Sequence, residues 1–325
     1  MYKVCSLFAG VGGIDIGFLN TKKCKIVYAN EFDHYAKKTY ELNFKNKIDC
    51  RDIHEVKTEE IPEFDIMVGG FPCTSFSVAG YRKGFQDDKT GDLFFEMERI
   101  FKERKPRVIF LENVKNLVGH DNGKTFATII KCLEKAGYKN KINFQVLNAC
   151  EYGNIPQNRE RIYIVAFRNE EDFIKFRMPM PITLKKKIKD IFDFKNKVDD
   201  KYYYTKGKYS DEMYNMLVQE MTDDSTVYQW RRKYVRKNQS KLVPTLTANM
   251  GEGGHNVPLI KTSYGIRKLM PIECFYAQGY PKSYKLPEDM SDAKLYKQAG
   301  NSVAVPVITR IAMNIINALD RNNEM

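Results

Sequence analysis

Short apolar runs alternate with segments of helical periodicity along the first half of the chain. Runs of this length that are continuously apolar are typical of buried strands. Those that we expect to form strands are 3–8, 25–29, 66–68, 108–111, 144–147 and 161–165. Between them, apolar positions recur at helical spacing at 93–101 and again at 126–133. The alternation predicts an α/β fold with a doubly wound sheet.

The alternation stops near Arg168. Residues 169–262 are rich in Lys, Tyr and Asn and show no regular succession of strands and helices. An α/β-like pattern then returns and ends in an amphipathic helix with apolar positions from 308 to 319. We therefore predict a first α/β part at 1–168, a smaller irregular insertion at 169–262, and a return segment at 263–325 that completes the first part.

The charge of the chain indicates a polyanionic partner. The net charge is +12 and the isoelectric point is near 9.1, which fits nucleic acid, although a generally Lys-rich surface would look similar. Residues 225–250 contain six basic residues and no acidic one, with Tyr228, Trp230 and Tyr234 interleaved. The basic residues are Arg231, Arg232, Lys233, Arg236, Lys237 and Lys241. This stretch favours a nucleic-acid surface over a solvated loop face.

The cysteines argue against a disulfide framework and against a zinc site. The seven cysteines are scattered, and none forms a Cys-x-x-Cys pair. This usage predicts a reducing, cytoplasmic environment and no metal. We expect no signal peptide before the first strand. The apolar segment at 304–316 contains Pro306 and Arg310, so we expect no membrane span there.

A glycine turn follows the first predicted strand, at 9–13, and Glu31 lies about 20 residues beyond it, where a doubly wound sheet places an acid on a ribose hydroxyl. The dinucleotide fingerprint requires a third glycine at a position that Asp15 occupies. A negative side chain there is a poor neighbour for phosphates. The layout therefore favours a nucleoside ligand without phosphates and disfavours a nicotinamide dehydrogenase.

Reactive side chains follow two predicted strands. Cys73 stands in the stretch 69–77, directly behind two glycines and Pro72, which stiffens the approach to the cysteine. Glu112 follows the strand at 108–111. Because the carboxyl ends of parallel strands form the ligand-binding edge, these residues are candidates for a nucleophile and an acid. A buried structural cysteine and a surface carboxylate are the alternatives.

Several motifs in order make the chain resemble the bacterial C5-cytosine-specific DNA methyltransferases of restriction-modification systems over nearly its whole length. The matching segments are 8–13, 30–32, 52–53, 72–73, 112–114, 157–161, 245–248 and 300–303. Thr74 departs from the family, which usually has glutamine there. The resemblance implies a Rossmann-like catalytic domain at 1–168 that is completed by 263–325, with a target-recognition domain at 169–262.

The resemblance also implies a reaction. The family transfers a methyl group from S-adenosylmethionine to C5 of a cytosine flipped out of a short sequence in double-stranded DNA, and releases S-adenosylhomocysteine. Cys73 would bond to C6 of the base, Glu112 would donate a proton at N3, and Arg161 with Arg159 would hold the O2 edge. The polar segment 78–88 resembles the family's mobile loop, which closes over the flipped base.

The candidate contacts with the cofactor carry over from the matching motifs. They are Phe8, Gly10, Val11, Gly12, Gly13, Asn30, Glu31, Phe32, Asp52, Ile53, Gly70, Pro72, Leu93, Asn301 and Ser302. The candidate contacts with DNA come from the basic stretch, its flanking glycines and the motif ends. They are Ser77, Gln229, Arg231, Arg232, Arg236, Lys237, Thr245, Gly253 and Gly254. We expect the protein to act as a monomer. A cognate restriction endonuclease encoded nearby stays open as a further partner.

Two other functions stay open on the residues. A tRNA cytosine-C5 methyltransferase of the same superfamily would use the same chemistry, but the long basic insertion favours duplex DNA. A DNA-binding protein on an inactive methyltransferase scaffold would not require Cys73, Glu112 and Arg161 to be intact, as they are here.

Overall fold

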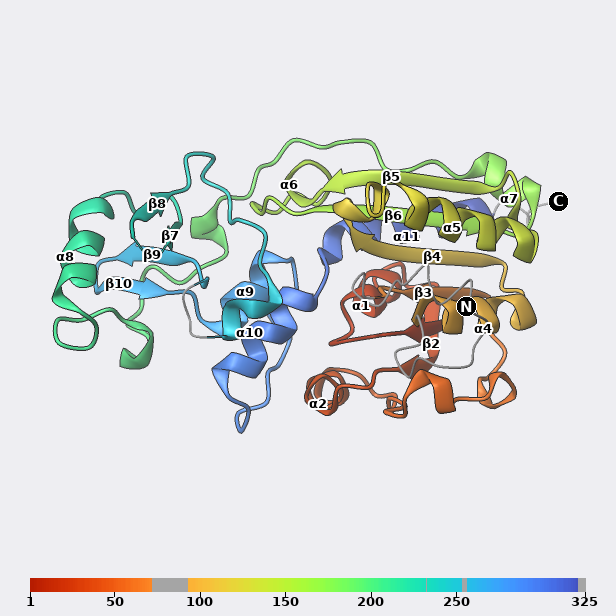
Figure 1. Cartoon of the computed structure of the whole chain (residues 1–325), viewed down its shortest axis with the longest axis horizontal. Helices are drawn as coiled ribbons and strands as arrows, with labels where there is room; N and C mark the ends of the chain where they lie inside the picture. Colours follow the sequence, from red (N-terminus) through yellow and green to blue (C-terminus); the bar gives the residue numbers. More distant parts are fainter. Residues whose placement is uncertain (72–92, 232, 253–255, 321–325) are drawn as a thin grey trace. The chain divides into compact units, whose positions relative to one another are not determined.

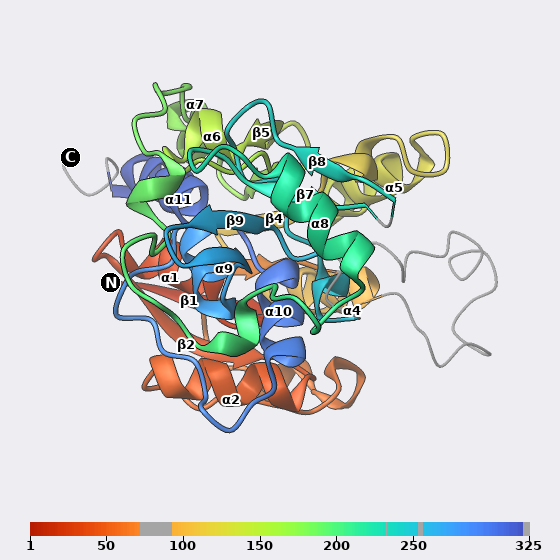
Figure 2. The same cartoon turned by 90° about the vertical axis from the view of Figure 1, so that its left-hand side faces the viewer.

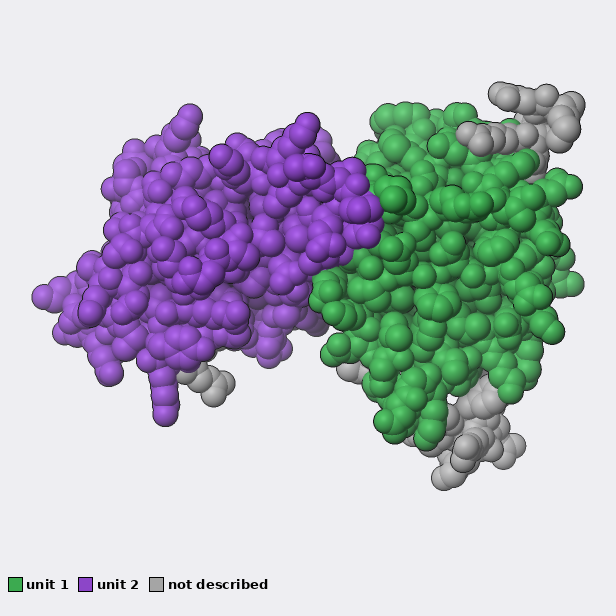
Figure 3. All heavy atoms as spheres, turned by 90° about the horizontal axis from the view of Figure 1, so that it is seen from above, with its two compact units in different colours: residues 1–147, 160–180, 307–325 green, residues 148–159, 181–306 purple. Residues whose placement is uncertain are grey.

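The computed structural model describes residues 1–71, 93–231, 233–252 and 256–320. The chain forms two compact units (Figure 3). Unit 1 comprises residues 1–147, 160–180 and 307–325, and unit 2 comprises 148–159 and 181–306. These bounds differ from the expected ones. Residues 148–159 and 263–306 belong to unit 2, so only 307–325 of the expected return segment lies in unit 1.

Unit 1 is built on a six-stranded sheet with strand order β2-β1-β3-β4-β6-β5 (Figure 1). The strands are β1 Tyr2–Leu7, β2 Cys24–Asn30, β3 Ile66–Gly69, β4 Val108–Val114, β5 Ile142–Asn148 and β6 Glu160–Phe167. β1 pairs parallel with β2 and β3, β3 pairs parallel with β4, and β4 pairs antiparallel with β6. The predicted α/β fold with a parallel-rich sheet is therefore confirmed.

Helices cover both faces of this sheet. The helices of unit 1 are α1 Gly13–Leu19, α2 His34–Asn43, α4 Leu93–Arg104, α5 Lys124–Leu133, α7 Glu170–Lys175 and α11 Val305–Asp320, with short turns η1 Ile53–Glu55, η2 Thr58–Glu60, η4 Lys115–Val118 and η5 Glu134–Tyr138. On one face, side chains of α4 and α5 pack on Met67, Ile109 and Leu111 in one buried cluster. On the other face, Phe18 of α1 packs edge-on against Phe110 of β4. Both layers are core contacts of a doubly wound fold.

One helical stretch among the described residues, Asp292–Asp320, is long and apolar enough to cross a membrane by length and composition alone. Its most apolar window is 67% buried inside the fold. Gly17 of α1 meets α11 so closely that a Cβ atom there would lie 2.4 Å from Ile308 Cγ2. The apolar face of α11 thus belongs to the protein core, as in the amphipathic core helix predicted from the sequence.

Unit 2 contains a small antiparallel sheet with strand order β10-β9-β7-β8 (Figure 1). Its strands β7, β8 and β9 are also labelled in the turned view of Figure 2. Its strands are β7 Tyr228–Trp230, β8 Val235–Lys237, β9 Leu259–Thr262 and β10 Gly265–Lys268. Its helices and turns are α6 Ala149–Tyr152, η6 Ile188–Asp190, η7 Asp200–Tyr202, α8 Asp211–Glu220, η8 Ala248–Gly251, α9 Pro271–Ala277 and α10 Asp292–Asn301. Leu217 of α8 packs with Tyr228, Leu259 and Ile266 of the sheet. The sequence pattern did not indicate this sheet, because each strand is only three or four residues long.

Candidate active site and nucleic-acid interface

The topology of unit 1 places a ligand site where β1 and β3 end. Leu7 and Gly69 are paired at the carboxyl ends of these parallel strands. β2 lies on one side of β1, whereas β3 and β4 lie on the other, so the strand order reverses between β1 and β3. In open α/β sheets, the crevice outside the strand ends at such a switch point binds ligands. The glycine turn leaves β1 at this edge, and Gly70 follows β3.

The glycine turn depends on backbone that few residues adopt. φ is +53° at Phe8, +55° at Gly10 and +81° at Gly12. At Gly12, a Cβ atom would also lie 2.2 Å from the ring of Phe44, so only glycine fits. Phe8 has a side chain and still takes a left-handed conformation, a strain that is typical of functional sites.

Glu31 ties the end of β2 to the glycine turn. Its Oε2 accepts a hydrogen bond from the Gly10 backbone amide at 2.9 Å, and its Oε1 accepts one from the Asp33 amide at 2.9 Å. A carboxylate oxygen accepts more than one hydrogen bond, and an acid at this place in a doubly wound fold is the group to which a ribose hydroxyl donates. Next to Glu31, the ring of Phe32 is 65% exposed and offers a face for stacking.

Asn30 and Asp52 hold the neighbouring segments in place. The Asn30 side chain donates to the carbonyls of Asp49 at 3.2 Å and Arg51 at 3.0 Å. Asp52 caps the η1 turn and contacts His54 Nδ1 at 2.5 Å. Partial burial opposes the ionisation of Asp52, but the hydrogen bonds from His54 outweigh it and hold the pKa below its ordinary value. The side chain of Ile53 is buried in the core.

Asp15, in the first turn of α1, lies inside the protein core. It is fully buried, and its carboxylate accepts hydrogen bonds from Ser6 Oγ at 2.5 Å and from the Tyr40 hydroxyl at 2.6 Å. Burial raises the pKa of Asp15 to about 6, against the lowering effect of both hydrogen bonds. Asp15 thus links β1, α1 and α2 beneath the turn, and its carboxylate does not point at a ligand above it.

Glu112 and Arg161 meet on one face of the sheet. In the antiparallel β4–β6 pair, Glu112 lies opposite Tyr163 and Val114 lies opposite Arg161, so Glu112 and Arg161 are diagonal neighbours. Their atoms Oε1 and Nε are 3.3 Å apart, and the two side chains are only 10% and 12% exposed. Arg161 Nη1 also donates to the Glu160 carbonyl at 2.8 Å. The pair is a preorganised acid and guanidinium, two of the predicted catalytic groups.

The chain after β3 passes directly beside Glu112. A Cβ atom at Gly70 would lie 3.4 Å from Glu112 Oε2. Asn113 Nδ2 donates to the Phe71 carbonyl at 2.8 Å, and the Phe71 ring is buried against Phe94. β4 therefore anchors the segment that leads to the predicted nucleophile.

Part of the predicted site lies outside the described residues. Pro72, Cys73, Ser77 and the predicted mobile loop at 78–88 belong to this part. Leu93, where the described chain resumes, is the first residue of α4 and packs against the core.

Arg159 has different surroundings from Arg161. It belongs to unit 2, and its side chain is 2% exposed. Its guanidinium donates to the carbonyls of Leu246 at 2.9 Å, Gly300 at 3.3 Å and Ser302. Arg159 thus joins two of the predicted motif segments, 245–248 and 300–303, through their backbones. We had expected Arg159 to hold the O2 edge of cytosine, but these contacts indicate that it binds the protein backbone instead.

These two segments pack backbone to backbone. A Cβ atom at Gly300 would lie 2.2 Å from the Thr247 carbonyl carbon, so only glycine permits the approach. Asn301 is exposed, whereas Ser302 is buried and its Oγ is hydrogen-bonded to the Tyr280 hydroxyl. Asn301 and Ser302 both belong to unit 2.

A polar pocket of about 430 Å³ in unit 2 gathers four of the predicted DNA contacts, namely Gln229, Arg231, Arg236 and Thr245. The other residues that line it are Asn158, Asn238, Ser240, Pro244, Thr247, Asn249 and Asn256. We call it the amide–arginine pocket. Guanidinium and amide groups are those that bind base edges and phosphates. Apart from Gln229, the sequence reasoning missed the amides of this pocket, although three of its four asparagines lie in the run 238–256.

The remaining predicted DNA contacts are not in this pocket. Lys237 lies on β8 with its ammonium 3.0 Å from Asp223 Oδ2. Arg232, Gly253 and Gly254 lie outside the described residues. Within the described ranges, no three His, Cys, Asp or Glu side chains come together as a metal site.

Comparison with known proteins reveals relatives over the whole chain. A family model described as C-5 cytosine-specific DNA methylase matches residues 2–317. Type II methyltransferase M.Bsp6I of Bacillus sp. (strain RFL6) is 60% identical over 319 residues, covering 98% of this chain and 100% of that protein. Type II methyltransferase M.HhaI of Haemophilus parahaemolyticus is 38% identical over 326 residues, covering 97% and 94%.

Solved structures share the fold at lower identity. A variant of Spodoptera frugiperda DNMT2 has a TM-score of 0.74 at 20% identity, with coverage of 97% of this chain and 100% of that one. A putative DNA modification methyltransferase from an Escherichia coli prophage has a TM-score of 0.69 at 20% identity, covering 98% and 100%.

Proposed function

Because the chain belongs to the family of C-5 cytosine-specific DNA methylases and is a DNA (cytosine-5-)-methyltransferase, we propose that it methylates C5 of a cytosine flipped out of a specific short sequence of duplex DNA. S-adenosylmethionine is the proposed donor, and Cys73 bonds to C6 of the base during the reaction. The observation that carries this proposal is the Glu112–Arg161 pair, held 3.3 Å apart beside Gly70 at the switch point of the sheet.

The donor set at the glycine turn fits S-adenosylmethionine. The Glu31 carboxylate suits a ribose hydroxyl, and the exposed ring of Phe32 suits adenine. The left-handed residues Phe8, Gly10 and Gly12 form a tight turn at the end of β1, which lets a ligand approach the backbone closely. When bound, the cofactor supplies an electrophilic methyl group. The other proposed contacts are Val11, Gly13, Asn30, Asp52, Ile53, Gly70, Pro72, Leu93, Asn301 and Ser302.

The residues of the chain then activate the base. Cytosine C5 is a weak nucleophile, and a bond from Cys73 sulfur to C6 makes C5 enamine-like. Glu112, as the acid, places a proton at N3, where negative charge develops, and Arg161 donates to O2. After methylation, loss of the C5 proton restores the C5–C6 double bond and expels the Cys73 thiolate. We assign Arg159 a positioning role, because its donors already bind three carbonyls.

We further propose that the amide–arginine pocket reads the DNA sequence. Arg231 and Arg236 suit guanine edges, and Gln229 and the asparagines suit adenine. Phosphate contacts from neighbouring lysines would add affinity without sequence preference. Double-stranded DNA is the proposed partner. We also propose that the enzyme is monomeric and cytoplasmic and that it acts beside a cognate restriction endonuclease.

A transfer assay with radiolabelled S-adenosylmethionine tests the proposal. We expect the wild type to incorporate labelled methyl groups into plasmid DNA and Cys73→Ala to incorporate none. Bisulfite sequencing of the product should place every methyl group in one short sequence. Incorporation into tRNA with none into DNA would instead establish the tRNA methyltransferase. Cofactor and DNA binding without transfer to either polymer would establish the inactive scaffold.

A further inference from the structure

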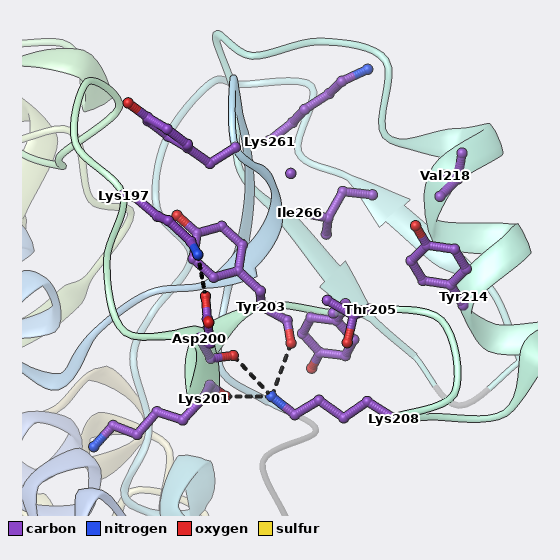
Figure 4. A pocket seen from close by; sticks show the side chains of 13 residues that line it. Lys197, Asp200, Lys201, Tyr203, Thr205, Lys208, Tyr214, Val218, Lys261 and Ile266 are labelled. Carbon is purple, nitrogen blue, oxygen red and sulfur yellow. Dashed lines mark hydrogen bonds and ion pairs between the residues drawn. The ribbon is translucent and has the colours of Figure 1, made fainter.

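A second hollow of unit 2 lies away from the amide–arginine pocket. Its volume is about 840 Å³, within the range of ligand sites, and four tyrosines and four lysines line it, with Asp200 as the one acid among the lining residues (Figure 4). We call it the tyrosine–lysine hollow. Lys261 and Ile266 place it at the β9–β10 edge of the small sheet, whereas Gln229 and Arg236 place the amide–arginine pocket at the β7–β8 edge.

The tyrosines form a firm wall with an accessible rim. Tyr203 and Tyr204 are 4% and 7% exposed. Tyr204 is stacked on Tyr209, with ring centroids 4.4 Å apart and planes at 21°. Tyr264, at the turn between β9 and β10, is 51% exposed, and Tyr214 comes from α8. The buried tyrosines thus form the wall and the half-exposed Tyr264 forms the rim, where its ring is accessible as a platform on which an unpaired base can stack.

Lys208 and Lys261 give the hollow a positive charge. Among the described residues, neither ammonium forms an ion pair with a carboxylate. Lys208 Nζ donates to the carbonyls of Asp200 at 3.2 Å, Lys201 at 2.9 Å and Tyr203 at 3.0 Å (Figure 4). An ammonium has three donors, so these bonds use all of them and leave the charge in place. Lys261 has no acidic partner among the described side chains either, and its ammonium remains available to a phosphate.

The other two lysines form ion pairs near the surface, and the Lys201 ammonium also lies 4.9 Å from the centroid of the Tyr202 ring. Lys197 is 2.8 Å from Asp200 and Lys201 is 3.1 Å from Asp292, with lysine side chains 58% and 52% exposed. Such pairs add little stability, so either lysine can turn towards a phosphate at small cost. Burial lowers the pKa of nearby Lys268, and Lys208 and Lys201 lower it further against Asp292. Lys208 and Lys201 thus lie near enough to Lys268 for their charges to repel it.

We propose that the tyrosine–lysine hollow binds an unpaired nucleotide of single-stranded nucleic acid, with the base against a tyrosine face and the phosphate at Lys261. An acidic peptide would satisfy the lysines but would leave the tyrosine wall without planar partners. The site goes beyond the proposed methyl transfer, because its residues belong to none of the catalytic, cofactor or DNA-reading sets.

Fluorescence anisotropy of the full chain with a labelled single-stranded oligothymidine of about 12 nucleotides tests this inference. Tyr264→Ala should weaken binding about tenfold, as expected for loss of one stacked base. Tyr264→Phe keeps the ring and should bind like the wild type. Lys261→Ala should weaken binding and reduce the slope of log K against log salt by about 0.7. Both alanine variants should still methylate duplex DNA, which shows that they fold.

Arg236→Ala is the control at the other edge of the sheet, and it should bind the single strand unchanged. If Arg236→Ala lost oligonucleotide binding and Tyr264→Ala kept it, the proposal would be overturned, because the single strand would then occupy the amide–arginine pocket. Absence of single-strand binding by the wild type would overturn it too. Equal displacement of the oligonucleotide by a Glu- and Tyr-containing peptide would assign the hollow to an acidic protein instead.

Discussion

Replacement of Arg159 should destabilise unit 2 without disturbing the Glu112–Arg161 pair. The guanidinium is 2% exposed and donates to three backbone carbonyls. Each buried acceptor left without a donor costs about 1–3 kcal/mol, and relaxation recovers part of this, so we expect Arg159→Ala to lose about 3–5 kcal/mol. Domains are typically stable by about 5–15 kcal/mol, so this loss is a large fraction.

The only tryptophan of the chain reports on this unit. Trp230 lies on β7 and is 9% exposed, in the core between the small sheet and α8. Urea titration followed by its fluorescence should therefore show an earlier transition for Arg159→Ala, with an intermediate effect for Arg159→Lys. Lysine keeps the charge and three donors but lacks the planar fork.

Arg161→Ala is the matched control. It should abolish methylation and leave the Trp230 transition in place, because Arg161 belongs to unit 1. If Arg159→Ala instead unfolds at the wild-type urea concentration and still loses methylation, Arg159 acts in the chemistry and the positioning role is wrong.

Three further predictions follow from single contacts. Glu112→Gln keeps a hydrogen-bonding side chain but lacks the acid, so the methylation rate should fall by about 10²-fold or more with DNA affinity nearly unchanged; equal loss of both in rate and binding assays would make Glu112 structural. Asp15 has its pKa raised to about 6 by burial, so the folded state binds a proton that the unfolded state releases from about pH 4 upwards. Stability should consequently fall by about 3 kcal/mol between pH 4 and 7, and urea titrations of Asp15→Asn should lack this fall. Arg236→Ala should relax the methylated sequence in bisulfite maps, whereas Lys237→Ala, next to it and paired with Asp223, should leave that sequence unaltered.

Much of the catalytic edge was predictable from the sequence, because it depends on local signals. Short apolar runs indicated the strands. Glu112 was expected just beyond the strand at 108–111, whereas β4 continues to Val114 and Glu112 lies within it, because pairing with β6 extends the strand past the apolar run. The Glu112–Arg161 contact itself depends on the antiparallel register of β4 and β6. No local pattern encodes that register, and only the resemblance brought the two residues together beforehand.

Arg159 and Asp15 show where sequence reasoning fails. Arg159 and Arg161 are two residues apart and would share a face if both lay in one strand. The chain passes from unit 2 to unit 1 between residues 159 and 160, so their surroundings differ. Asp15 occupies a helix N-terminus, which usually indicates exposure to a ligand, but the hydroxyls of Ser6 and Tyr40 hold it inside. Tertiary hydrogen bonds decided both positions.

A mechanism-based adduct tests the central claim most directly. Release of Cys73 requires loss of the C5 proton, and a target cytosine with fluorine at C5 has no proton there to lose. A duplex that carries this base should therefore trap the protein in a complex that survives denaturant and requires both S-adenosylmethionine and Cys73. Mass spectrometry should find one protein bonded through Cys73 to one methylated fluorocytosine strand. An active enzyme that methylates ordinary cytosine but forms no adduct with the fluorinated duplex would contradict attack by Cys73 at C6.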